Sequence, residues 1–219
     1  MIMSAIIIAS SILTRSIQTT VLSLKNYNIA NLIKENNGII TSKEVSKHGI
    51  NRMFLTRLVK SGKIERIKKG LYILSNTWGD EYFNLTFGIN AIFSYDTALY
   101  FLGLCETVPT IYHITVCRGY NGKLNHDDNV KLHFVKREIF ELGKIEIKSP
   151  QGQIISCYNA ERCICDLLKN KDNEDLETVK YAITEYLRDK QNRDLPKLVE
   201  YSKKLKIESE VNRYLEVLM

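Results

Sequence analysis

The sequence predicts an α+β protein with a small basic N-terminal domain and a larger C-terminal domain of mixed α/β structure that ends in several helices. Residues 41–74 have the pattern of helix, glycine turn, helix and hairpin. Short apolar or alternating runs typical of strands fill much of residues 111–158, and apolar stripes at helical spacing follow. A chain of 219 residues, 44% of them hydrophobic, is long enough for two such domains.

The N-terminal domain, at residues 27–76, begins with a short amphipathic helix. The apolar stripe of this helix ends at Asn36-Asn37-Gly38. Ile39 and Ile40 follow as a brief strand.

The next residues predict two helices joined by a tight turn. Ser42 begins the first helix and Gly49 forms the turn. Asn51 is a good N-cap for a second helix, which runs from Arg52 to about Ser61. At about 100° per residue, this second helix has one apolar face and one outward, cationic face. The residues of the outward face are Arg52, Met53, Thr56, Arg57 and Lys60.

A basic hairpin completes the domain. Gly62 ends the second helix, and two short apolar runs flank the turn Lys68-Lys69-Gly70. A helix-turn-helix followed by such a hairpin is a winged helix-turn-helix, and helix-turn-helix proteins place their second helix in the major groove of DNA.

Positive charge is concentrated in this domain. Residues 26–75 contain ten Lys or Arg and three Glu, a net charge of +7, whereas the whole chain carries +6. Such a local excess favours binding to the DNA backbone. We therefore expect double-stranded DNA as a partner, with two copies of the chain, as a possible homodimer, on an inverted repeat whose half-sites lie about 10 bp or a multiple apart. The candidate DNA-binding residues are Ser42, Lys43, Arg52, Met53, Thr56, Arg57, Lys60, Arg66, Lys68 and Lys69.

Residues 1–26 are expected to form an extension that is either poorly ordered or a marginal helix. Their apolar start lacks the cationic segment of an export signal, and their uncharged run is too short to span a membrane. The five cysteines are odd in number and irregularly spaced, which argues for a reducing compartment. We therefore expect a cytoplasmic protein.

The C-terminal domain, at residues 77–219, follows a turn-rich segment. Residues 76–166 carry a net charge of −3 and residues 167–219 a net charge of zero, so this domain is suited to a different partner from DNA. A helix is expected after Ser94. Strands are expected at 111–117, 130–136, 144–148 and 153–158, and helices at 160–168, 176–189, from Pro196 onward, and 208–218. One stripe of the 176–189 helix consists of Leu176, Val179, Ile183 and Leu187.

Two other classes of function stay open. Asp127 or Asp128 together with Glu146 and Lys148 mimics the carboxylates and lysine of a metal-dependent nuclease, although a half-exposed strand shows the same alternation. The other class is a stand-alone transcriptional regulator whose C-terminal domain senses a small ligand.

The remaining candidates for chemistry fit structural roles. Two histidines lie in apolar strands, a Cys-x-Cys pair has no second pair at metal-ligand spacing, and a cluster of acids and one arginine opens a helix. We therefore predict no enzymatic activity, no metal site and no cofactor. These groups are His113 and His133, Cys163 and Cys165, and Glu161, Arg162 and Asp166.

Two blocks of the C-terminal domain are distinctive, Ser94-Tyr95-Asp96-Thr97-Ala98-Leu99 and Glu161-Arg162-Cys163-Ile164-Cys165-Asp166. Together with the hairpin segment Gly70-Leu71-Tyr72-Ile73-Leu74, they resemble the AbiE-type antitoxins (AbiEi family) of bacterial abortive-infection systems, which act in phage defence. The resemblance covers about Tyr27 to Met219. The sequence departs from the family at Tyr95 and Leu102, where the family often has His.

The resemblance implies two linked functions of a type IV toxin-antitoxin system. The winged helix would repress the chain's own promoter by binding inverted repeats. The C-terminal domain would counteract a co-encoded toxin that looks like a nucleotidyltransferase. Type IV pairs are defined by antagonism without a stable complex of toxin and antitoxin, so the resemblance does not imply direct binding.

Overall fold

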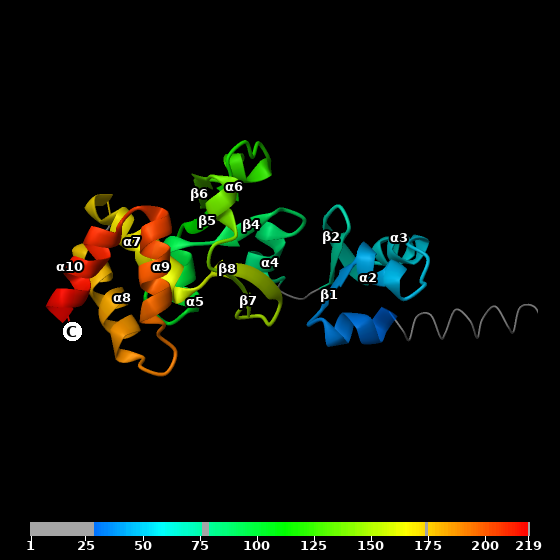
Figure 1. Cartoon of the computed structure of the whole chain (residues 1–219). Helices are drawn as coiled ribbons and strands as arrows, with labels where there is room; N and C mark the ends of the chain where they lie inside the picture. Colours follow the sequence, from blue (N-terminus) through cyan, green and yellow to red (C-terminus); the bar gives the residue numbers. More distant parts are fainter. Residues whose placement is uncertain (1–28, 76–78, 174, 219) are drawn as a thin grey trace, which may run out of the picture. The chain divides into compact units, whose positions relative to one another are not determined.

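A computed structural model of the chain describes residues 29–75, 79–173 and 175–218. The protein is a mixed α+β structure that divides into two compact units (Figure 1). Among the described residues, one unit contains 29–75 and 79–84 with Gln151–Gln153, and the other contains 85–150 and 154–218 without residue 174. The extension expected at residues 1–26 lies outside the described residues.

The first unit contains the helices and strands expected for residues 29–74. Its three strands form an antiparallel sheet in the order β1-β3-β2. The hairpin β2–β3 directly follows the two helices α2 and α3. The elements are a helix at 29–35, β1 (Ile39–Thr41), α2 (Ser42–Lys47), α3 (Met53–Lys60), β2 (Ile64–Lys68) and β3 (Leu71–Leu74).

The core of the first unit lies where the inner faces of these elements meet. Ile29 comes from the first helix, Ile40 from β1, Val45 from α2, Leu55 from α3 and Ile64 from β2, and all five side chains are buried. Complete burial of an aliphatic side chain stabilises a fold by about 1.5–3 kcal/mol. This core therefore fixes the inner side of α3 and leaves its opposite side available to a ligand.

The second unit is built around a five-stranded mixed sheet in the order β6-β5-β4-β8-β7. The pairs β5–β6 and β4–β8 are parallel, and the pairs β4–β5 and β7–β8 are antiparallel. Helix α4 (Glu81–Thr86) includes the point of division after Asn84. The helices and strands that follow it are β4 (Ala91–Phe93), α5 (Tyr95–Phe101), β5 (Tyr112–Cys117), β6 (Val130–Val135), α6 (Arg137–Phe140), β7 (Lys144–Lys148) and β8 (Ile154–Tyr158).

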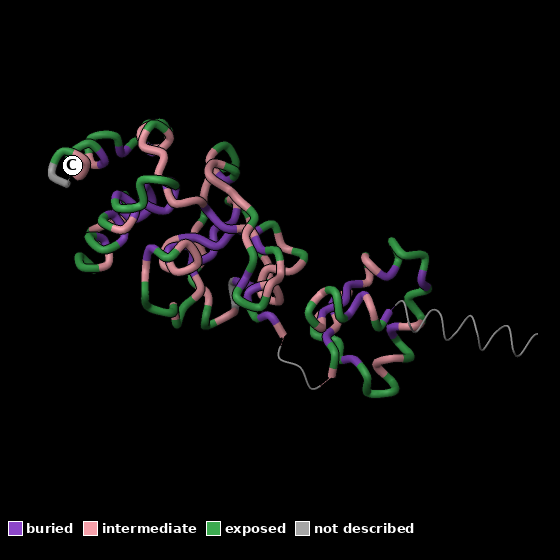
Figure 2. Tube along the Cα trace, turned by 90° about the horizontal axis from the view of Figure 1, so that it is seen from below, coloured by how far each residue is buried: buried purple, intermediate pink, exposed green. Residues whose placement is uncertain are grey.

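The end of the chain is helical, as expected. The helices are α7 (Ala160–Lys169), α8 (Leu176–Arg188), α9 (Leu195–Leu205) and α10 (Glu208–Leu218). Helix α7 is the central one, because it contacts α5, α8, α9 and α10 and its residues 161–168 are all buried. In Figure 2, the buried positions of this unit lie inside it and the exposed ones at its turns and outer helix faces. None of the helices in the described segments is long and apolar enough to cross a membrane.

The structure differs from the sequence-based expectation at several points. Leu176 was placed on the apolar stripe of α8 but is 57% exposed, because it is the first residue of the helix and the buried stripe starts at Val179. Strand β4 and the short helices α4 and α6 were not predicted.

Candidate DNA-binding surface

Helix α2 is fixed at both ends by hydrogen bonds. At its start, Thr41 Oγ1 accepts a hydrogen bond from the Glu44 backbone N at 3.2 Å, and Glu44 Oε2 accepts one from the Thr41 backbone N at 2.9 Å. This is a capping box, which satisfies backbone donors that a helix start leaves unpaired. After the helix, Gly49 has a φ of +68°, in the left-handed region that favours glycine. The Ile50 N–H then donates to the carbonyl of Val45 at 3.0 Å, so the direction in which the chain enters α3 is fixed.

Helix α3 begins at Met53, one residue later than the sequence suggested. Arg52 occupies the N-cap position and makes no capping bond with its side chain. Asn51 still contributes to the helix start, because its Oδ1 accepts a hydrogen bond from the Met53 backbone N at 2.9 Å. The first turn of α3 therefore stays well defined although the cap residue differs from the expected one.

The outer face of α3 is cationic and exposed. The opposite face is buried through Leu55, and Phe54 and Leu58 pack partly against the same core. Residues 52–60 contain three cations and no acidic residue, so no carboxylate of the helix itself neutralises them. All five residues expected on the outer face are exposed, namely Arg52, Met53, Thr56, Arg57 and Lys60.

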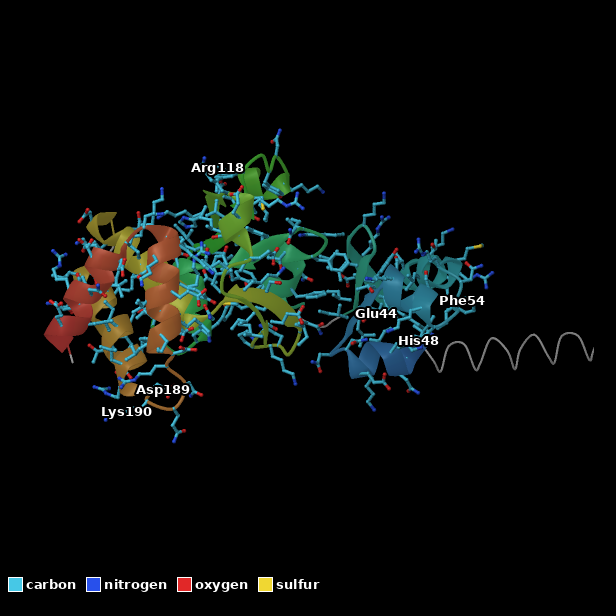
Figure 3. All side chains as sticks on the ribbon, viewed as in Figure 1. Glu44, His48, Phe54, Arg118, Asp189 and Lys190 are labelled. Atoms are coloured by element: carbon cyan, nitrogen blue, oxygen red, sulfur yellow. The ribbon has the colours of Figure 1, made fainter. Side chains whose placement is uncertain are left out.

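Neighbouring side chains orient Arg57 of α3 and Arg52 at its N-cap. Arg52 Nε donates to Ser46 Oγ at 2.8 Å, and Ser46 Oγ donates to the carbonyl of Ser42 at 2.9 Å. The Arg57 guanidinium lies 5.6 Å from the ring centroid of Phe54, which is labelled in Figure 3. An Arg52 guanidinium bound through Nε keeps its terminal N–H groups for a phosphate or a base edge. Ser46 was not among the residues expected from the sequence, because its contact with Arg52 spans the turn between two helices.

The three cations of the hairpin β2–β3 differ in how exposed they are. Arg66 and Lys69 are exposed. Lys68 is only half-buried, and its ammonium donates to the backbone carbonyl of Asn84. Gly70, with a φ of +85°, makes the turn between the strands. Of the three hairpin cations expected to contact DNA, Lys68 is thus already bound to a backbone group in this structure.

A hydrogen bond ties the hairpin to α2. The Ser42 backbone N donates to the carbonyl of Gly70 at 2.8 Å, and the Ser42 side chain is half-buried beside it. Lys43, the next residue of α2, is exposed. The contacts from Ser42 to the hairpin and from Arg52 to Ser46 therefore bring the three elements that carry the candidate residues together within one compact unit.

The structure separates the residues of the possible nuclease site. Glu146 and Lys148 are exposed on β7, at one edge of the five-stranded sheet. Asp127 and Asp128 precede β6, at the opposite edge. Four strand spacings of about 4.8 Å put roughly 19 Å between these edges, too far for one metal ion to be shared. The carboxylate and lysine arrangement considered from the sequence is therefore wrong.

The two histidines pack against each other in the second unit. His113 Nδ1 lies 3.4 Å from His133 Nε2, and the Tyr95 ring stacks on His133 with centroids 3.9 Å apart. Burial lowers the pKa of His133 to about 3 and also lowers the pKa of His113, against the opposing effect of Asp96. Both rings are therefore neutral at neutral pH. The described segments contain no group of three or more His, Cys, Asp or Glu side chains suited to a metal ion.

The cluster at the start of α7 is structural. Arg162 Nε binds Asp166 Oδ2 at 2.9 Å, with both side chains buried. Glu161 Oε1 accepts hydrogen bonds from the Tyr186 hydroxyl at 3.2 Å and from the Asp194 backbone N at 3.1 Å. The contacts of Glu161 join α7 to α8 and to the start of α9. All three charged side chains of the cluster are thus engaged in contacts within the fold.

Comparison with known proteins supports a regulatory role for the first unit. Residues 28–75 match the family model of the AbiEi antitoxin transcriptional regulators, which confirms the resemblance over these residues. No curated protein is significantly similar to the chain. Among solved structures, the chain is similar to the RV2827C protein from Mycobacterium tuberculosis, at 10% identity and a TM-score of 0.43 over 83% of this chain and 75% of that chain. A likeness this low says nothing about function.

Proposed function

We propose that this chain, whose residues 28–75 match the AbiEi antitoxin transcriptional regulators, is a cytoplasmic autorepressor and antitoxin. Its first unit acts as a winged helix that binds inverted repeats in the chain's own promoter. Its second unit counteracts a co-encoded toxin similar to nucleotidyltransferases, with or without a stable complex. We assign no catalytic step to the chain.

The observation that carries the DNA-binding part is the outer face of α3. Arg57 and the N-cap residue Arg52 are exposed, the inner face of the helix is buried in the core, and the hairpin with Arg66 and Lys69 lies in the same unit. In a helix-turn-helix, the second helix enters the major groove and neighbouring cations contact phosphates. Arg57, over the Phe54 ring, is the residue we assign to guanine, because an arginine can form two hydrogen bonds to O6 and N7 of that base.

The DNA-binding part is tested by gel shift with the full chain and a duplex from its own promoter. A paired contact to guanine contributes about 1–3 kcal/mol of discrimination, so Arg57→Ala should lose about 5- to 150-fold of the preference for promoter over random duplex. Lys190→Ala is the matched control, because Lys190 is an exposed cation of the second unit (Figure 3) and should leave binding unchanged. Equal binding by the two variants would contradict the proposal.

The antitoxin part is tested in cells. The adjacent gene is expressed with and without this chain, and growth is scored. We expect the adjacent gene alone to stop growth, and both the wild-type chain and Arg57→Ala to restore it, because that substitution touches only the first unit. Lack of rescue by the wild type, together with normal promoter binding, would favour a stand-alone regulator instead.

A further inference from the structure

Met53 is exposed in a way that the fold does not explain. With 62% of its surface accessible, it is more exposed than the other large apolar side chains of the described segments, of which Val108 and Leu176 come next at 57%. It lies outside the hydrophobic core that buries Leu55 on the same helix. Its apolar side chain is therefore available for contact with another molecule.

Met53, the first residue of α3, lies on the cationic face of the helix. Residues three, four and seven positions apart share one side of a helix, so Met53 lies in line with Thr56, Arg57 and Lys60. Its neighbour Arg52 is drawn toward α2 by Ser46. Because the first residues of the second helix in a helix-turn-helix contact base edges, Met53 is placed to meet a base rather than a phosphate.

The chemistry of the side chain selects its ligand. A thioether has no charge and no N–H or O–H donor, so it gains nothing from a phosphate. In the major groove, the apolar group on the edge of a base pair is the C5-methyl of thymine. Methionine is flexible and polarisable, which suits contact with such a methyl group.

We propose that Met53 is a specificity-determining residue that recognises the C5-methyl group of a thymine in each half-site. The inference rests on the proposed DNA-binding function and adds the base that the first turn of α3 reads. Met53 contributes apolar contact there, and Arg57 reads a neighbouring guanine.

The test removes the methyl group from the DNA. The full chain first selects its preferred duplex from a random pool, and each thymine of that duplex is then replaced singly by uracil, which lacks only the C5-methyl. Burial of one such group contributes about 0.8 kcal/mol, which corresponds to a factor of about four in affinity. Fluorescence anisotropy should therefore show one thymine per half-site whose replacement weakens wild-type binding about fourfold.

Variants assign this effect to a residue. Met53→Gln keeps the length of the side chain but makes its end polar, so it should bind the thymine and uracil duplexes equally. Met53→Leu should keep the discrimination. Thr56→Ser deletes the other exposed methyl group of this face, so it tests whether Thr56 makes the methyl contact in place of Met53. All four proteins should melt at the same temperature, since both positions are exposed.

Three results would overturn the inference. The first is a wild type that binds its selected duplex and is indifferent to uracil at every position. The second is a fourfold effect that persists in Met53→Gln. The third is loss of the effect in Thr56→Ser, which would assign the methyl contact to Thr56. If the chain does not bind specific DNA at all, the wild type will enrich no duplex from the pool. That result would refute the proposed function and, with it, the recognition of thymine by Met53.

Discussion

Removal of the Arg162 guanidinium should strongly destabilise the second unit. Arg162 Nε lies 2.9 Å from Asp166 Oδ2, and Nη1 donates to the carbonyls of Ile139 at 2.7 Å and Leu142 at 2.9 Å. The guanidinium also lies 4.2 Å from the centroid of the Tyr158 ring. One side chain thus ties α7 to β8 and to the segment around α6. Arg162→Met keeps much of the apolar stem and removes the charge and all donors.

The magnitude follows from burial. The side chains of Arg162 and Asp166 are 1% and 7% exposed, and loss of one partner of a buried ion pair costs about 3–5 kcal/mol. Each of the two carbonyls that loses its hydrogen-bond donor costs at most about a further 1–3 kcal/mol. The costs of neighbouring contacts do not simply sum. We expect a loss of about 4–6 kcal/mol, which at a urea dependence of about 2 kcal/mol per M lowers the unfolding midpoint by about 2–3 M.

The pH dependence of this loss has a definite sign. Burial raises the pKa of Asp166, and Arg162 opposes that rise. Without the arginine, the carboxyl group takes up a proton at higher pH, which removes the unpaired charge. The difference in stability between wild type and Arg162→Met should therefore become smaller as the pH falls.

An exposed ion pair supplies the control. Lys204 and Glu200 on α9 lie 2.6 Å apart with side chains 52% and 57% exposed, so Lys204→Met should cost less than about 1 kcal/mol. Urea unfolding followed by circular dichroism compares the two variants. A loss in Arg162→Met no larger than in Lys204→Met would show that the buried pair stabilises the second unit no more than an exposed pair does.

Three further outcomes are expected. Ser46→Ala should weaken promoter binding several-fold without lowering the melting temperature. When Arg52 is already replaced by Ala, the Ser46→Ala substitution should have no further effect on binding. Additive effects of the two substitutions in anisotropy titrations would count against the contact between Ser46 and Arg52. Lys69→Ala should lower the slope of log affinity against log salt by about one, and an unchanged slope would remove Lys69 from the phosphate contacts. Because burial lowers the pKa of His133 from 6.5 to about 3, the unfolded chain binds the proton more tightly, and stability should decrease as the pH falls below about 6.5. His133→Phe should lose less stability than the wild type between pH 7 and 5 in urea titrations, and equal losses would speak against this cause.

Local patterns predicted much of the fold. The turn at Gly49 and the apolar positions of α3 are short-range features, and the hairpin strands flank a turn that ends in glycine. Strand β4 has three residues, too few for a periodic pattern, and its place in the middle of the sheet depends on pairing with β5 and β8, which are distant in sequence.

The candidate site could be predicted where it depends on helical spacing alone. The exposed face of α3 is of that kind. The contact of Lys68 with the Asn84 carbonyl is not, since it joins residues 16 positions apart. The separation of Asp128 from Glu146 likewise depends on strand order, which no local pattern encodes.

Binding of α3 and the adjacent hairpin to an inverted repeat in the chain's own promoter can be measured by a DNase footprint of the full chain on that promoter. We expect two protected half-sites in inverted orientation, spaced by about 10 bp or a multiple, and their loss in Arg57→Ala. A promoter left unprotected by the wild type, or a footprint of one asymmetric site that Arg57→Ala leaves unchanged, would rule out this mode of binding.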